Sequence, residues 1–199
     1  MDQGERSFPR HRRSTRVRLL AAAEECFLAD GIPHTSMEDV ARRARISRPT
    51  IYRHFSDRDG LIRAALEWRA QAFGERLHAH VARFPTFQER ILEGLVFFVL
   101  WGRRDPILRG MLQPEDHEDA SGLTLVTELA PELVHKMWHP LLHEAQQAGA
   151  LSGDLDLRQV SGLFSDLELM LVARQEIIDF SGSSVRDMLR AYLLPVLTA

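Results

Sequence analysis

The chain has a single cysteine, Cys26, among its 199 residues, so it has no internal disulfide. This excludes the small secreted domains that depend on disulfides, and a cytoplasmic location is the simplest expectation. No apolar run reaches ~18 residues, which argues against a transmembrane helix. The first residues also lack the apolar stretch of a signal peptide.

Sequence motifs of common enzyme classes are missing as well. The chain contains no GxSxG, no phosphate-binding loop and no CxxC pair. Strand signals are absent, because no sustained alternation of apolar and polar residues occurs and no hairpin turn joins two such runs. The sequence therefore predicts an all-α protein that is not an enzyme and has no cofactor.

Charge is spread unevenly along the chain, although the formal net charge is only −3. Residues 1–60 hold 12 arginines and 9 acidic residues, whereas residues 61–199 hold 13 basic and 19 acidic residues. Basic clusters of this kind suit phosphate groups, although a charged surface in contact with solvent gives the same pattern. The clustered arginines are Arg10, Arg12, Arg13, Arg16, Arg18, Arg42, Arg43, Arg45, Arg48, Arg53 and Arg58.

Apolar residues recur with helical spacing along the whole chain. In the first predicted helix, 15–29, Cys26 lies on the apolar stripe and is read as a small buried hydrophobe. Short helices are predicted to begin at Ser36 and after Ser47, with the segment 113–122 as a loop. Capping boxes are predicted for the pairs Ser36 and Asp39, and Ser56 and Asp59. The remaining predicted helices are 57–82, 86–103 (apolar all round at 95–101), 107–112, 123–128, 131–148, 157–180 and 183–196.

The second and third predicted helices are joined only by Ala44, Arg45 and Ile46, which is the arrangement of a helix-turn-helix. Ile51 and Phe55 are four residues apart in the third helix, so both face inward. The opposite face of that helix is then free to enter the major groove of DNA.

The outward face of the third helix carries side chains that suit DNA. Arg48, in the first turn, matches guanine O6 and N7, and Pro49 offers an apolar contact to a thymine methyl. Tyr52, Arg53 and His54 can donate hydrogen bonds to phosphates. For each residue alone, a half-buried or ordinary surface position remains open.

The segment TRVRLLAAAEECFLADGIPHTSMEDVARRARISRPTIYRHFSDRDGLIRAAL, 15–66, resembles the N-terminal domain of the TetR/AcrR family of transcriptional regulators. The matching marks are LLAAA in the first helix, TSMEDVA in the second, PTIYRHF in the third and the following GL. The resemblance implies a ligand-responsive regulator, most often a repressor. Such a regulator binds a palindromic DNA operator as a homodimer and is released by a small, hydrophobic effector. It equally allows an activator, or a regulator without an effector.

The resemblance also implies roles by position. Thr35, Tyr52, His54 and Arg58 stand where the family contacts phosphates, and other positions in the third helix face bases. The full predicted DNA-binding set is Thr35, Ser36, Arg45, Ser47, Arg48, Pro49, Thr50, Tyr52, Arg53, His54 and Arg58. Arg45 departs from the family, which usually has glycine there. If the turn needs a positive φ, arginine costs on the order of 1 kcal/mol, unless the turn differs or the strain is offset by a DNA contact.

Three segments follow from these observations: a basic arm at 1–14, a helix-turn-helix domain at 15–60, and a regulatory and dimerisation domain at 61–199. The family implies a ligand pocket in the last domain and dimerisation through its final two long helices. Glu168, in an otherwise apolar run, is open to three roles: pocket wall, dimer contact or solvent-facing residue. The predicted ligand-binding residues are Phe97, Phe98, Trp101, Met111, Leu112, Met137, Trp138, Phe164, Glu168 and Met170. The predicted dimer residues, which could equally form intramolecular core, are Leu163, Leu167, Leu171, Val185, Met188, Leu189, Tyr192 and Leu193.

A metal-dependent helical enzyme is the distant alternative. His135, His139 and His143 are spaced by four residues and could line one helix face. Against it, Pro140 is expected to kink or break that helix between His139 and His143, and no HExxH relation is present. The sequence therefore predicts no metal site.

Overall fold

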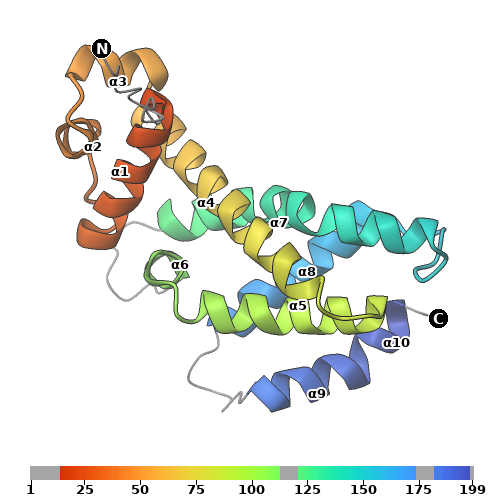
Figure 1. The fold of residues 1–199 in the computed structure, drawn as a ribbon. Helices are drawn as coiled ribbons and strands as arrows, with labels where there is room; N and C mark the ends of the chain where they lie inside the picture. The colour runs from red at the N-terminus through yellow and green to blue at the C-terminus, as the bar shows by residue number, and fades with distance from the viewer. Residues whose placement is uncertain (1–13, 113–120, 174–181, 198–199) are drawn as a thin grey trace, which may run out of the picture.

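The computed structural model describes residues 14–112, 121–173 and 182–197, and within these residues the fold is entirely helical (Figure 1). This confirms the predicted all-α class. None of the described helices combines the length and the apolar content that a bilayer span requires. The helices are α1 (Thr15–Asp30), α2 (Met37–Ala44), α3 (Arg48–His54), α4 (Arg58–Val81), α5 (Phe87–Gly102), α6 (Pro106–Leu112), α7 (Ser121–Gln147), α8 (Leu157–Ala173), α9 (Gly182–Tyr192) and α10 (Leu194–Leu197).

The first three helices form a small bundle at one end of the molecule (Figure 1). Its core contains Leu19 and Phe27 of α1, Val40 of α2 and Ile51 of α3, all at most 4% exposed. Cys26 is 1% exposed in the same core, as a small hydrophobe would be. Helical periodicity predicts these buried positions because the apolar stripe of each helix faces the other helices of the small bundle.

Helix α4 runs from this bundle into the larger group of helices (Figure 1). Leu61 and Ala65, in its first turns, belong to the core of the small bundle. Phe73 and Leu77, further along, belong to the second core. A single unbroken helix therefore connects the two cores.

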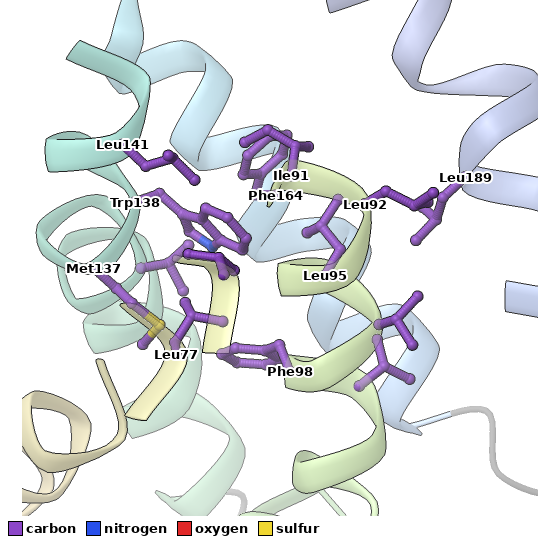
Figure 2. Close-up of a cluster of buried hydrophobic side chains, with 14 of the residues drawn as sticks. Leu77, Ile91, Leu92, Leu95, Phe98, Met137, Trp138, Leu141, Phe164 and Leu189 are labelled. Carbon is purple, nitrogen blue, oxygen red and sulfur yellow. The ribbon is translucent and has the colours of Figure 1, made fainter. Parts of the chain in front are cut away.

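The second core surrounds Trp138 of α7, which is 1% exposed (Figure 2). Its ring meets Phe164 of α8 edge-on, with 5.1 Å between ring centroids. Helix α5 comes close because Gly94 has no side chain: a Cβ there would lie 2.5 Å from Cη2 of Trp138. The apolar run at 95–101 was predicted to be buried all round, and all of its residues pack into this core or against it.

Helix α7 corrects the predicted helices 123–128 and 131–148. The structure has one helix over Ser121–Gln147, with both Pro131 and Pro140 inside it. Proline removes one backbone hydrogen bond and usually bends a helix, at a cost of ~3 kcal/mol. Here the helix continues because its apolar face, including Trp138 and Leu142, is buried in the second core. Of the expected kink or break at Pro140, the break does not occur.

Helix starts follow the sequence with one exception. The Ser36 hydroxyl accepts a hydrogen bond from Asp39 N, and Ser36 N donates to the Asp39 carboxylate at 3.1 Å, which confirms the first capping box. The predicted box of Ser56 and Asp59 was wrong. Asp57 is the N-cap of α4, and its carboxylate accepts from Gly60 N at 2.7 Å. The Asp57 carboxylate, one position after Ser56, accepts directly from the first-turn amide.

Some predicted features lie outside the described residues. These are Arg10, Arg12 and Arg13 of the basic arm, most of the loop 113–122, and the end of the predicted helix 157–180.

Candidate nucleic-acid interface and buried cavity

The turn between α2 and α3 has left-handed backbone at Arg45, with φ 54° and ψ 49°. Arg45 N donates to Arg42 O at 3.1 Å and Ile46 N donates to Ala41 O at 2.9 Å. This pair of bonds is a Schellman motif, which normally has glycine at the left-handed position. The sequence left the conformation of Arg45 open; the structure gives it a positive φ, so the turn has the form that usually holds glycine. Arg18 of α1 also donates to Ala44 O at 2.7 Å, a contact that the sequence did not indicate.

Arg45→Gly is expected to raise the free energy of unfolding by about 1 kcal/mol, because glycine adopts positive φ without the clash of a Cβ. Chemical denaturation of both proteins measures the difference. Arg42→Gly, in the interior of α2, is the matched control and is expected to lower stability by about 1 kcal/mol. Equal stability of wild type and Arg45→Gly would contradict the strain at this turn.

Helix α3 has one buried and one exposed face. Ile51 is 0% and Phe55 is 5% exposed, whereas Arg48, Pro49 and Arg53 are exposed. Tyr52 is 40% exposed, and Thr50 and His54 are half-buried. Ser47 is the N-cap residue by its backbone, but its hydroxyl makes no cap bond and lies 2.8 Å from the Thr50 hydroxyl. The exposed face therefore carries the side chains that were predicted to contact DNA.

Arg48 is held by neighbours in this structure. Its guanidinium lies 2.9 Å from the carboxylate of Glu38 on α2 and 5.7 Å from the centre of the Tyr52 ring. Both partners of the ion pair are exposed, so the pair is weak and exchangeable. Glu38 belongs to this surface, but the sequence pattern did not identify it. An acidic residue is common in the first turn of any helix, so its presence there did not indicate a functional role.

Three other predicted DNA-binding residues are engaged within the chain. Thr35 is 3% exposed, and its hydroxyl donates to Gly31 O at 2.8 Å. Arg58 donates from Nε to Thr35 O at 2.8 Å and from Nη2 to Ile32 O at 2.5 Å. Ser36 caps α2. These residues fix the segment that connects α1 and α2, rather than extending from the surface.

A cavity of about 120 Å³ lies among the larger helices. It is lined almost entirely by apolar side chains of α4, α5, α6, α7 and α8. Its polar residues are Arg69, Asp105, Ser165 and Glu168. Ile107 and Met111 of α6 line the cavity and also pack into the core of the small bundle. The cavity therefore adjoins the residues that support the α3 surface. The lining residues are Leu66, Arg69, Ala70, Phe73, Phe98, Trp101, Asp105, Ile107, Leu108, Met111, Leu129, Ala130, Leu133, Val134, Met137, Ser165, Glu168 and Leu169.

The cavity brings together half of the predicted ligand-binding residues: Phe98, Trp101, Met111, Met137 and Glu168. The other half do not line it. Met170 is 41% exposed. The remaining four pack in or against the cores: Phe97, Leu112, Trp138 and Phe164. Apolar periodicity alone does not distinguish a cavity wall from a filled core, because both are buried on the same helix face.

Glu168 is 0% exposed, which places it at the cavity wall among its three possible roles. Its Oε1 accepts a hydrogen bond from Trp138 Nε1 at 3.0 Å. Within the described residues, its Oε2 and the Ser165 hydroxyl are buried without a hydrogen-bond partner. Burial raises the pKa of the Glu168 carboxyl well above its ordinary value, and the bond from Trp138 opposes this only in part.

This raised pKa predicts how stability depends on pH. The folded state holds the Glu168 proton more tightly than the unfolded state, so the free energy of unfolding falls as the pH rises above about 4.5. Glu168→Gln cannot lose a proton. The stability of the wild type relative to Glu168→Gln is therefore expected to decrease as the pH rises above 4.5, as measured by denaturation at several pH values. Parallel pH profiles for the two proteins would contradict a neutral Glu168. Arg69 and Asp105, the other charged residues that line the cavity, pair with each other.

Arg69 of α4 connects three helices. Its guanidinium bonds Glu24 of α1 and Asp105 at the start of α6, and it lies 5.7 Å from the centre of the Trp101 ring. Asp105 is 5% exposed, and its other oxygen accepts from Leu108 N at 2.8 Å. The cavity wall is thereby tied to the small bundle.

The predicted dimer residues divide into three groups by exposure. Leu171, Val185 and Leu189 are at most 2% exposed and belong to the intrachain core. Leu167, Met188 and Leu193 are partly buried against that core. Leu163 and Tyr192 are 48% and 78% exposed. Helix α9 packs on α5, which accounts for the buried members (Figure 1).

The three histidines do line one face of α7, because the helix continues through Pro140. The ring centroids of His135 and His139 are 5.0 Å apart, and those of His139 and His143 are 5.6 Å apart. His135 Nδ1 lies 3.1 Å from the Ser161 hydroxyl. In the part of the chain that the structure describes, no group of three His, Cys, Asp or Glu side chains could hold a metal ion.

Comparison with known sequences points to one family. Residues 19–65 match the family described as bacterial regulatory proteins, tetR family. The chain is 28% identical to the HTH-type transcriptional regulator UidR of Escherichia coli strain K12, over 93% of this chain and 94% of that protein.

Solved structures share the fold over almost the whole chain. The TetR family repressor AlkX from Dietzia aligns with a TM-score of 0.67 and 21% identity, covering 94% of this chain and 99% of that one. FadR from Bacillus subtilis, solved in complex with stearoyl-CoA, aligns with a TM-score of 0.57 and 19% identity, covering 87% and 96%.

Proposed function

We propose that the chain is a helix-turn-helix transcriptional regulator of the TetR family, and that it is a repressor that binds a palindromic operator as a homodimer. A small, mainly apolar effector that enters the cavity releases it from DNA.

The observation that carries the proposal is the division of α3 into two faces. Ile51 and Phe55 fix the helix on the bundle, and Arg48, Pro49 and Arg53 extend from the opposite face. A helix anchored in this way can lie in the major groove with its first-turn side chains at the base edges. Arg48 is the residue for guanine, and Arg53 and Tyr52 are placed for the phosphates on either side.

Dimerisation is supported by exposed apolar side chains on the last long helices. Leu163 and Met170 of α8 and Tyr192 of α9 are 48%, 41% and 78% exposed. A two-fold dimer would cover such residues and would present two copies of α3 to the two halves of a palindrome.

Effector response is supported by the position of the cavity. Ile107 and Met111 of α6 line the cavity and also belong to the core of the small bundle. A ligand that binds one position of α6 better than another shifts the population toward that position, and the shift reaches α3 through the shared core. AlkX is described as a repressor, and FadR was solved with a fatty acyl-CoA, which agrees with an apolar effector in this fold.

Footprinting of the purified protein on the DNA upstream of its own gene tests the proposal. We expect a protected site with two-fold symmetry, and a dimer by analytical ultracentrifugation. Arg48→Ala, which changes an exposed residue, is expected to lose the protection while the fold is kept. Absence of a protected site, or identical DNA binding by Arg48→Ala, would count against the assignment of α3.

A further inference from the structure

Two buried polar groups on residues that line the cavity have no hydrogen-bond partner among the described residues. They are Glu168 Oε2 and the Ser165 hydroxyl, 0% and 1% exposed as residues. Both line the cavity, and they are three residues apart on α8, so they lie on the same side of that helix. Buried polar groups are almost always hydrogen-bonded, so two unpaired groups on one cavity wall indicate that a polar ligand atom belongs between them.

The cavity limits the size of such a ligand. Its volume is about 120 Å³. An engineered protein cavity of ~150 Å³ with a similarly apolar lining accepts benzene. The rest of the wall is apolar, with Phe73, Phe98 and Trp101 among its residues. A single ring or a short branched hydrocarbon fills this space.

We propose that the cavity binds a neutral, mainly apolar molecule of about one ring that carries a hydroxyl group, and that this hydroxyl is held between Glu168 and Ser165. The inference rests on the proposed function, since it names the chemistry of the effector for the same cavity. Oε1 of Glu168 accepts from Trp138, so the proton of the neutral carboxyl resides on Oε2. That proton donates to the ligand oxygen, and the ligand hydroxyl donates to Ser165 Oγ.

The charges of the cavity favour a neutral ligand over an ionic one. A cationic amine requires an ionised Glu168, which burial disfavours. An anionic ligand requires a cation, and the Arg69 guanidinium already bonds Glu24 and Asp105. A hydroxyl satisfies both unpaired groups with no change of charge.

Three probes of nearly equal size and shape separate these possibilities: benzyl alcohol, ethylbenzene and benzylamine. Each is titrated into the full chain at neutral pH and followed by NMR. We expect benzyl alcohol to bind about tenfold more tightly than ethylbenzene, because it gains two hydrogen bonds. Benzylamine is expected to bind most weakly.

Variants test the two groups separately. Ser165→Ala and Glu168→Met are each expected to reduce the preference for benzyl alcohol over ethylbenzene, while ethylbenzene affinity is kept. Retained ethylbenzene binding shows that the variant is folded. Glu168→Gln, which keeps a donor but has no charge, is expected to keep benzyl alcohol binding.

Three results would overturn the inference: equal binding of benzyl alcohol and ethylbenzene, tightest binding of benzylamine with its loss in Glu168→Gln, or no binding of any probe. The DNA footprint is measured in the absence of the three small-molecule probes. Failure of the DNA-binding proposal can therefore be distinguished from failure of the cavity proposal. Protection of DNA without probe binding refutes only the cavity chemistry. Probe binding without DNA protection refutes only the regulator.

Discussion

Replacement of Arg69 with methionine is expected to lower the free energy of unfolding by about 3–5 kcal/mol, because it leaves the buried carboxylate of Asp105 without a counter-charge. Asp105 is 5% and Arg69 is 16% exposed in the side chain, so neither group has much access to water. Methionine keeps most of the aliphatic volume, which isolates the effect of the charge. Chemical denaturation at neutral pH measures the change.

Two further variants control this prediction. Arg63→Met removes the exposed pair of Arg63 with Glu128 on the same helix, where the side chains are 47% and 59% exposed, and is expected to cost less than about 1 kcal/mol. The double variant Arg69→Met with Asp105→Asn removes both buried charges and is expected to regain much of the loss. Equal effects of Arg69→Met and Arg63→Met would show that Asp105 does not depend on Arg69.

Arg48→Ala is expected to weaken binding of the operator by about 30-fold to 10⁴-fold, since each half-site loses a base contact worth ~1–3 kcal/mol and a dimer has two half-sites. Fluorescence anisotropy at fixed salt concentration measures the affinity. The loss is expected to depend on base sequence, so binding to unrelated DNA changes less. A uniform loss on all DNA would instead assign Arg48 to a phosphate.

Glu38→Gln is the matched variant with the opposite expected result. In the free protein the Glu38 carboxylate lies 2.9 Å from Arg48, and both side chains are exposed. The substitution releases Arg48 and removes a negative charge from the surface that is proposed to face DNA phosphates. Operator binding is therefore expected to strengthen severalfold, with stability changed by less than ~0.5 kcal/mol. Weaker binding by Glu38→Gln would mean that Glu38 positions Arg48 for the base, or contacts DNA itself.

The helix-turn-helix could be predicted from sequence because its determinants are local. Apolar spacing identified Ile51 and Phe55 as anchors, and the family resemblance marked Arg45 as a departure whose strain depended on the form of the turn. Each depends on neighbours within a few residues along the chain. The same reasoning placed the cap of α4 one residue early, since Ser56 and Asp57 are both good N-caps and only backbone geometry separates them.

The cavity could be predicted only in part. Phe98, Trp101 and Met137 were identified because large apolar and Met residues on buried helix faces suit a pocket. Trp138 and Phe164 have the same character, yet they fill the core between α7 and α8. Whether a buried side chain lines the cavity or fills the core depends on how the neighbouring helices pack against it. Sequence periodicity shows which side chains are buried, but not how the neighbouring helices are placed.

By itself, the sequence determined the helical class and the two-faced α3, whereas the left-handed conformation of Arg45 came from the structure. Only the tertiary structure decided that α7 continues through Pro131 and Pro140, that Leu171, Val185 and Leu189 face the intrachain core, and that Glu168 opens onto a cavity. Only the tertiary structure shows that Arg69 bonds Glu24 and Asp105, which lie 45 and 36 positions away along the chain. The physical reason is range: caps, turns and periodicity act within one or two helical turns, whereas burial and ion pairing depend on helices that meet only after the chain has folded.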